Sequence, residues 1–314
     1  MELKVAATDT ILMVRPIDFG FNTETAASNA YQVKDDSKSA AQINSEAILE
    51  FDNMVAVLRA AGINIIVVQD TAEPKTPDSI FPNNWVSFHE DGRVFTFPME
   101  AKNRRLERRR DILEMLKYEE GMQLDSIVDL SIHELEGKYL EGTGSIVWDR
   151  ANKTAYACLS TRTNADLLQK HLDYFEGAKS VIFHAKDEKG KDIYHTNVVM
   201  CIGNGFCVVC MDAIPTDEER TKVRKALEND GFEIVDISFD QMNRFAGNML
   251  QVKNTDNQPV LVMSSQAYNA LDESQISRLQ TYTSIVHAPI DTIETAGGGS
   301  ARCMMAEVFL PRIG

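Results

Sequence analysis

Apolar residues recur at the spacing of one helix face in five stretches of the chain, and each stretch passes into a short apolar run typical of a strand. The first stretch carries an apolar stripe from Ile43 to Leu58 and ends at Gly62, a residue suited to a helix C-terminus. Similar junctions recur about every 55 to 60 residues, so the pattern indicates one unit present five times. The other helices are expected over 104–120, 166–176, 216–230 and 272–282.

Between the predicted helices lie pairs of short strand-like runs joined by turn residues, the pattern of a β-hairpin. A hairpin before a helix disfavours a purely parallel open sheet, which is the alternative architecture. No strand–strand–helix–strand unit can bury its apolar face alone, so five units are expected to close into a ring. We therefore predict an α/β fold in a single domain over residues 1–314. The predicted strand pairs are 84–88 with 93–97, 145–148 with 155–159, and 198–202 with 206–210.

Composition and net charge disfavour two classes of binding partner. Apolar residues make up 44% of the chain, and the formal net charge of −15 argues against a nucleic acid or an anionic membrane surface as partner. The basic run at 104–110 has leucine at helical spacing and a glutamate inside it, so it is interpreted as a solvated helix face rather than an RNA-binding patch. No early apolar stretch has the length of a signal peptide or a membrane span, and a cytoplasmic location is expected.

The five cysteines are an odd number scattered through apolar runs, which indicates a reducing compartment rather than a disulfide framework. Cys207 and Cys210 have the spacing of a metal or redox pair, but a strand would point them to opposite faces, so they are expected in the core and no metal is predicted. Cys303 differs because three glycines and a serine lead into it and leave room above the sulfur. It is the candidate nucleophile, with an inert buried thiol as the alternative.

Partners for Cys303 are expected at the equivalent edge of the other units, because loops at one mouth of a closed ring lie close together. Three segments there carry suitable groups: a turn running into a predicted strand, a glycine-rich turn, and a histidine directly before a strand. A cysteine with a histidine and a carboxylate is the set that nucleophilic catalysis needs. In chain order the three segments contribute Asp78, Asn83 and Asn84, then Glu141, then His195.

This order of residues resembles the guanidine-modifying, or pentein, superfamily, and the resemblance spans nearly the whole chain. That superfamily includes arginine and agmatine deiminases, dimethylarginine dimethylaminohydrolases and amidinotransferases, and the segment 15–32 is similar to its bacterial amidinotransferase-related branch assigned to citrulline use. The resemblance implies a five-bladed ββαβ propeller with pseudo-five-fold symmetry and a reaction without metal or organic cofactor.

The same resemblance implies roles for individual residues. Cys303 corresponds to the nucleophile, His195 to the general acid and base, and Glu141 to a carboxylate that holds the substrate and orients the histidine. Arg162, and more loosely Arg105, correspond to arginines that bind the α-carboxylate of the substrate.

One departure from the related hydrolases bears on the substrate. Those enzymes have acidic residues after a phenylalanine, where this chain has Asn83 and Asn84 after Phe81 and Pro82. A carboxylate pairs with a guanidinium cation, whereas an amide accepts one hydrogen bond and donates another, as a neutral ureido group requires. The sequence therefore favours a cysteine-dependent hydrolase of a ureido amino acid such as citrulline, with Asp78 and the two asparagines as substrate ligands.

Other activities of the superfamily stay open at this stage. An amidinotransferase, an arginine deiminase or a dimethylarginine dimethylaminohydrolase would use the same cysteine and histidine, and Glu141 would hold a guanidino substrate. A non-enzymatic protein with the same propeller is disfavoured, because nucleophile, histidine and carboxylate are all present. The expected partner is a small-molecule amino acid, and a homo-oligomer is compatible with the sequence.

Overall fold

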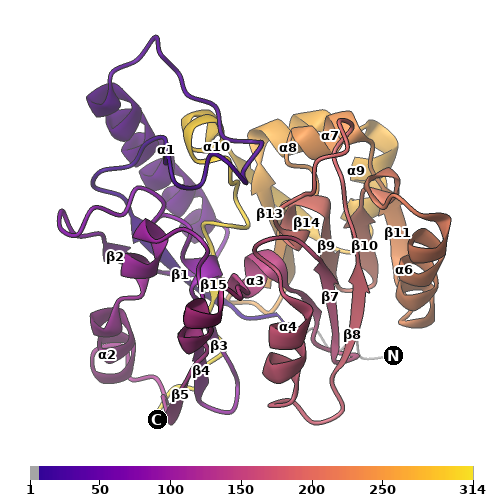
Figure 1. Ribbon diagram of the computed structural model, residues 1–314, viewed down its shortest axis with the longest axis horizontal. Helices are drawn as coiled ribbons and strands as arrows, with labels where there is room; N and C mark the ends of the chain where they lie inside the picture. Colours follow the sequence, from indigo (N-terminus) through magenta and orange to yellow (C-terminus); the bar gives the residue numbers. More distant parts are fainter. Residues whose placement is uncertain (1–6, 314) are drawn as a thin grey trace.

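The structure is a computed structural model that describes residues 7–313. Within this range, five sheets of three strands each form blades around a common centre, with the longer helices on the outside (Figure 1). In every blade two strands pair antiparallel, and a third strand pairs parallel with the middle one. The predicted α/β propeller with five ββαβ units is therefore confirmed.

The first blade contains the first and the last strand of the described chain. Its middle strand β1 (Thr10–Arg15) pairs parallel with β2 (Asn64–Gln69) and antiparallel with β15 (Ala306–Glu307), where Leu12 faces Ala306. The last strand therefore completes the first blade and closes the ring.

The other four blades follow one another along the chain. In chain order their strands are β3 (Val86–Phe88), β4 (Arg93–Thr96) and β5 (Ser126–Asp129); β6 (Val147–Asp149), β7 (Thr154–Cys158) and β8 (Lys179–Phe183); β9 (Met200–Gly203), β10 (Phe206–Val209) and β11 (Glu233–Asp236); and β12 (Leu250–Lys253), β13 (Pro259–Ser264) and β14 (Ser284–Ala288). Contacts between inner strands join β15 to β3, β6 to β9 and β9 to β12.

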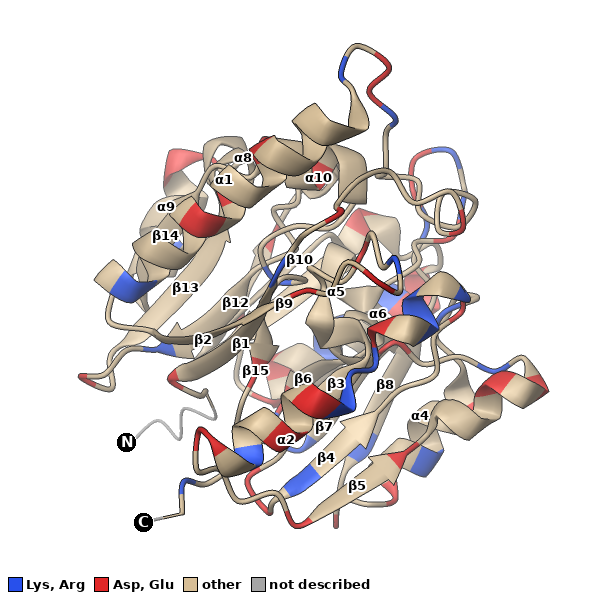
Figure 2. Cartoon of the chain, turned by 90° about the vertical axis from the view of Figure 1, so that its left-hand side faces the viewer, with Lys and Arg blue, Asp and Glu red and all other residues tan. Residues whose placement is uncertain are grey.

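One long helix in each blade covers the outer side of its sheet. In α1 the stripe predicted from Ile43 to Leu58 is buried, and Ser39 and Gln42 form a capping box that begins the helix. Charges of both signs lie on these helices and on loops, while the strands are mostly uncharged (Figure 2). The five helices are α1 (Ala40–Ala60), α2 (Arg110–Tyr118), α4 (Ala165–Leu172), α6 (Asp217–Asn229) and α9 (Glu273–Gln280).

The helix predicted over 104–120 is wrong in its first part. Residues Asn103–Glu107 form a separate 3₁₀ turn, η2, and α2 begins only at Arg110. The turn breaks the helical phase and buries the Arg104 side chain, which is 3% exposed, instead of placing it on a solvated face. The basic run is thus divided between the interior and the surface.

The inner strands also begin later than predicted, because a single helical turn comes before three of them. These turns are η1 (Pro82–Asn84), α3 (Gly142–Ser145) and α5 (Thr196–Val199). Cys303 likewise lies in a turn, and the strand expected directly after it is limited to β15. Turns of three or four residues have no periodic pattern of their own, so tertiary contacts decide their conformation.

Two further observations concern the described part of the chain as a whole. All five cysteines are free and buried, including Cys207 in β10 and Cys210 directly after it. Within residues 7–313, no group of three or more histidine, cysteine and acidic side chains is placed to hold a metal ion, and no helix has the length and apolarity to cross a membrane.

Candidate active site

The turns that enter the inner strands converge at one mouth of the propeller. Asn84 comes from η1, Glu141 and His195 are the residues directly before α3 and α5, and Cys303 lies in the turn before β15. The structure thus brings together residues that are far apart in the chain. A small cavity there is lined by Asn29, Asp78, Phe81, Asn84, Arg104, Arg162, Tyr194, His195, Gly297, Gly298, Gly299 and Cys303.

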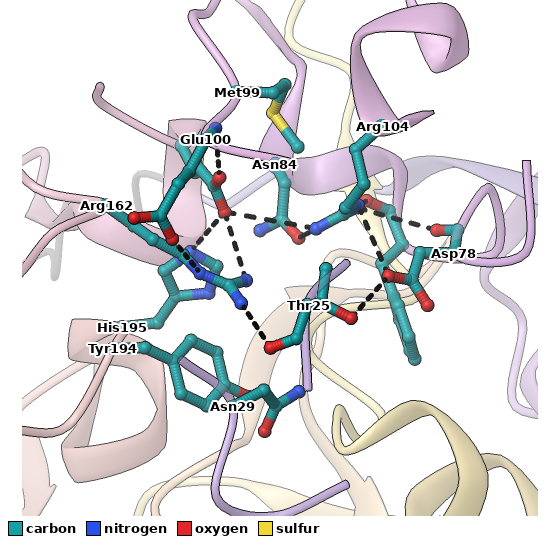
Figure 3. A network of polar contacts seen from close by, with 12 residues as sticks. Thr25, Asn29, Asp78, Asn84, Met99, Glu100, Arg104, Arg162, Tyr194 and His195 are labelled. Carbon is teal, nitrogen blue, oxygen red and sulfur yellow. Dashed lines mark hydrogen bonds and ion pairs between the residues drawn. The ribbon is translucent and has the colours of Figure 1, made fainter. Parts of the chain in front are cut away.

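His195 is held in one orientation by Glu141 beneath it. The Nε2 atom of His195 lies 2.8 Å from Oε2 of Glu141, and both side chains are buried. His195 itself lies beside Tyr194 (Figure 3). Burial lowers the pKa of His195, an effect that the carboxylate partly offsets. A carboxylate only accepts hydrogen bonds, so the neutral imidazole carries its proton on Nε2 and has a free lone pair on Nδ1.

Glu141 is surrounded by donors that keep it ionised. Its Oε1 accepts a 2.9 Å hydrogen bond from the backbone N–H of Glu100, and its Oε2 lies 3.5 Å from Nη1 of Arg162 and 3.9 Å from Nη1 of Arg104. Burial alone would raise the pKa of this carboxyl, but Arg162, His195 and Arg104 together lower it well below its ordinary value. The carboxylate can therefore orient the histidine and favour its protonated form during a reaction.

Two glycines of α3 allow the turns to approach one another this closely. A Cβ on Gly144 would lie 2.4 Å from Nδ2 of Asn84 and 2.7 Å from Nδ1 of His195. Gly142 has φ +48°, and a Cβ there would lie 2.3 Å from the carbonyl oxygen of Asn83. The glycine-rich turn noted in the sequence therefore provides space for the site.

Asn84 presents one defined end of its amide to the cavity. Its Oδ1 accepts a 2.9 Å hydrogen bond from Nη1 of Arg104, and arginine can only donate. The Nδ2 end therefore faces Gly144 and His195, and it has no hydrogen-bond partner among the described residues. The site offers a donor at this position.

Arg104 is one of the residues of this site that the sequence did not reveal. Its Nε and Nη2 atoms each donate a 2.9 Å hydrogen bond to Glu107, and Nε lies 3.7 Å from Oδ2 of Asp78. Burial would lower the pKa of Arg104, but Glu107 and Asp78 raise it, so the guanidinium stays charged. No local signal distinguishes Arg104 from its neighbours in the basic run; only the 3₁₀ turn directs it inward.

The remaining predicted site residues divide into those that line the cavity and those that do not. Asp78 lines it, its Oδ1 has no hydrogen-bond partner among the described residues, and burial raises its pKa. Arg162 lines it too, with its guanidinium 4.9 Å from the centre of the Tyr194 ring. Asn83 is buried outside the cavity, and Arg105 donates to the carbonyl oxygens of Met99 and Glu100, also outside it.

A loop near the start of the chain covers the mouth. We call residues 19–31 the cover segment. Its Asn22 donates a 2.7 Å hydrogen bond to Asp78, and its Asn29 donates to the carbonyl oxygens of Gly297 and Gly298 at 3.2 and 3.3 Å. The enclosed cavity measures about 10 Å³, roughly the space of one water molecule. A cavity of this size cannot hold an amino acid, so part of the mouth must move before one can enter.

Cys303 is enclosed by side chains from two other blades. Its Sγ atom lies 3.4 Å from Nδ2 of Asn197 and 3.4 Å from Nδ2 of Asn248. The sequence analysis identified neither asparagine. Both lie in the turns that enter inner strands, the same place as Asn84, so an alignment of the five units would have revealed them.

Comparison with known proteins gives one family and one fold. The model of the family described as N,N dimethylarginine dimethylhydrolase, eukaryotic, matches residues 15–310. No curated protein sequence matches the chain.

Solved structures similar to the chain agree on the arrangement of the blades. The apo structure of ArgZ, an arginine dihydrolase from the ornithine–ammonia cycle in Cyanobacteria, aligns with a TM-score of 0.72 at 17% identity over 97% of this chain. The present chain spans 41% of that protein, whereas the N-terminal domain of ArgZ, bound to substrate, is covered over 97% of its length with a TM-score of 0.70. A dimethylarginine dimethylaminohydrolase in an adduct with S-methyl-L-thiocitrulline aligns with a TM-score of 0.62 at 14% identity, over 96% of this chain and 99% of that one.

Proposed function

The chain belongs to the dimethylarginine dimethylhydrolase family, with the fold of the pentein superfamily, and on this basis we propose that it hydrolyses a C–N bond of a ureido amino acid, with citrulline as the first candidate. The predicted superfamily is thereby confirmed, and with it the class of C–N hydrolases to which the family belongs. The observation that carries the proposal is the convergence of Cys303, His195 and Asn84 on one cavity, with Glu141 directly behind the histidine.

The side chains support a two-step reaction. His195 Nδ1 accepts the thiol proton of Cys303, and the thiolate attacks the planar ureido carbon. The resulting imidazolium, stabilised by Glu141, donates its proton to the departing nitrogen, so ammonia leaves and a thiocarbamate remains on the sulfur. His195 then activates water, which breaks the C–S bond and restores the thiolate. The carbamate released decomposes, so citrulline and water give ornithine, carbon dioxide and ammonia.

Asn84 supports a ureido substrate over a guanidinium one. Because Arg104 occupies its oxygen, Asn84 turns an N–H toward the cavity, where a ureido oxygen can accept it. A guanidinium has only N–H donors and would face that group without forming a hydrogen bond. The unpartnered Oδ1 of Asp78 supplies an acceptor for the ureido nitrogens.

Arginine is the second candidate substrate, and Asp78 is the observation that favours it. An ionised carboxylate in the cavity pairs with a guanidinium, and one of the structural neighbours is an arginine dihydrolase. Attack on arginine followed by hydrolysis would release ammonia and leave citrulline, which the same site would then hold. One enzyme would thus convert arginine to citrulline and then hydrolyse the citrulline.

Several finer features are part of the same proposal. We expect residues 1–314 to act as one catalytic domain on a small amino acid, and the pairing of β15 with β1 supports this because it closes the ring of blades. A cytoplasmic location is supported by the five free cysteines. The proposed roles of Arg162 and Asp78 are the binding of the substrate carboxylate and of the ureido nitrogens.

A product assay tests the proposal. The protein is incubated with citrulline, arginine, agmatine and methylated arginines, and ammonia and the residual amino acid are quantified. We expect the highest kcat/KM for citrulline and a loss of at least about a thousandfold in kcat for Cys303→Ser. A preference for arginine would select the second candidate, and full activity of Cys303→Ser would refute the thiolate mechanism.

A further inference from the structure

The sulfur of Cys303 lies between two amide groups that the mechanism above does not use. Asn197 follows His195 by two residues and lies in α5, and Asn248 directly precedes the inner strand β12 of the next blade. Both Nδ2 atoms are 3.4 Å from Sγ, and both residues are buried. The nucleophile is thus contacted by two donors that belong to neither the histidine nor the carboxylate.

The orientation of the Asn248 amide is determined by the backbone. Its Nδ2 donates a 2.8 Å hydrogen bond to the carbonyl oxygen of Asn197, and its Oδ1 accepts a 3.1 Å hydrogen bond from the N–H of Arg302. A rotated amide would place oxygen against oxygen and N–H against N–H. The neutral thiol can also donate to this Oδ1, which lies 3.7 Å from Sγ, whereas a thiolate can only accept from the Asn248 N–H at 3.4 Å.

Two features hold this arrangement together. Gly247 lets the turn before β12 pack against α5, since a Cβ there would lie 2.3 Å from the carbonyl oxygen of Val198. The side chain of Asn197, in contrast, contacts only the sulfur through Nδ2, and its Oδ1 has no hydrogen-bond partner among the described residues. Asn248 is the fixed donor and Asn197 the more independent one.

Two N–H donors on one sulfur stabilise its anion more than its neutral form, because charge strengthens a hydrogen bond. We propose that Asn248 and Asn197 are catalytic donors that stabilise the Cys303 thiolate, both as the attacking group and as the group that leaves when the thio intermediate is hydrolysed. This inference rests on the proposed function, because the proposed function makes Cys303 the nucleophile. The thiol proton goes to Nδ1 of His195, and the sulfur keeps the electron pair of the broken S–H bond.

The ionisable groups around the sulfur are the same in the unmodified protein and in variants of the two asparagines. The ionisable groups lining the same cavity are Asp78, Arg104, Arg162, Tyr194 and His195, with Glu141 behind the histidine. Replacing Asn197 or Asn248 leaves all of these groups in place. A change in the fraction of thiolate in such a variant therefore reports the loss of the amide.

The test measures alkylation of Cys303 by iodoacetamide in the free protein as a function of pH, with the modified residue identified by mass spectrometry. Asn197→Ala removes the contact with the sulfur and no other side-chain hydrogen bond. We expect the pH of half-maximal alkylation rate to rise by about one unit, equivalent to about tenfold less thiolate at neutral pH. Asn197→Asp, which keeps the shape and adds a negative charge, should raise it further.

Asn243→Ala is the matched control, because this asparagine is exposed and its side chain donates only to Glu188 on the surface. Asn248→Ala should raise the alkylation midpoint in the same direction, with thermal unfolding used to confirm that the variant folds. An unchanged midpoint in folded Asn197→Ala and Asn197→Asp would overturn the proposal. If the midpoint shifts but citrulline and arginine are not converted, the proposed substrates fail while the role of the two asparagines stands.

Discussion

Asn83 and Asn84 are neighbours in one turn, yet only Asn84 lines the cavity. The difference at the residue scale comes from Arg104, which binds the Asn84 oxygen and leaves its nitrogen facing inward. A single hydrogen bond thus decides whether this position donates to the substrate or accepts from it. The sequence identified the amide but not its orientation, because the arginine that fixes it lies 20 residues further along the chain.

Replacing Asn84 by aspartate exchanges the inward N–H for an oxygen with almost no change in shape. We expect the ratio of kcat/KM for citrulline to that for arginine to fall roughly 5- to 150-fold, equivalent to about 1–3 kcal/mol, because the carboxylate pairs with guanidinium and repels the ureido oxygen. Steady-state kinetics with both substrates measure this ratio. Asn83→Asp is the control, since its side chain is outside the cavity, and an equal shift in both variants would contradict the role given to Asn84.

At the scale of elements, what the sequence predicts well is local. The helices and the number of blades follow from burial patterns within 10 to 20 residues, and α1 illustrates this with its buried stripe and its capping box. The one-turn helices η1, α3 and α5 were not predictable, because contacts between blades determine them. Arg104 and Arg105 show the consequence for predicting the site. They are adjacent in the sequence, but the 3₁₀ turn directs Arg104 to the site and Arg105 away from it.

The helix α4 carries a group that makes stability depend on pH. His171 is fully buried among Phe95, Phe97, Trp148 and Phe175, and neither ring nitrogen has a hydrogen-bond partner among the described residues. Burial, with Arg150 and Arg93 nearby, lowers the pKa of His171 to about 3. In the unfolded chain the His171 imidazole binds a proton near pH 6.5, whereas in the folded protein it stays neutral down to about pH 3. The free energy of unfolding therefore falls as the pH drops from about 6.5 toward 3.

His171→Leu should remove this dependence. Between pH 7 and pH 4, we expect the free energy of unfolding of the variant to fall by about 3 kcal/mol less than that of the unmodified protein. Urea denaturation at the two pH values measures the difference. Gln169→Leu, on the exposed side of the same helix, introduces the same side chain without removing a titratable group. If both variants lose stability in acid as the unmodified protein does, His171 is not responsible.

At the scale of the whole molecule, access to the site depends on the cover segment. Cys303 is 3% exposed, and residues 19–31 are fastened to the rest of the mouth through Asn22, Ser28 and Asn29. We therefore expect reagents and substrates to reach the sulfur when this segment moves away, and the few hydrogen bonds that hold the segment to control how often it does so.

Asn29→Ala removes the bonds to the carbonyl oxygens of Gly297 and Gly298. We expect alkylation of Cys303 by iodoacetamide at a fixed pH to become roughly fivefold faster, because about 1 kcal/mol less is needed to open the mouth. Mass spectrometry of the labelled peptide over time measures the rate. The control Ser37→Ala, on an exposed loop outside the cover segment, should leave the alkylation rate unchanged. An unchanged rate in Asn29→Ala would show that the cover segment does not limit access.

The pairing of β15 with β1 joins the two ends of the ring, so the site can be completed only late in synthesis. A ribosome makes Glu141 and His195 more than a hundred residues before it adds Cys303, and β15 follows the cysteine directly. Until that strand joins β1, the proposed acid–base pair has no proposed nucleophile facing it. Under the proposed function, a chain interrupted before residue 303 therefore lacks its nucleophile and should be inactive.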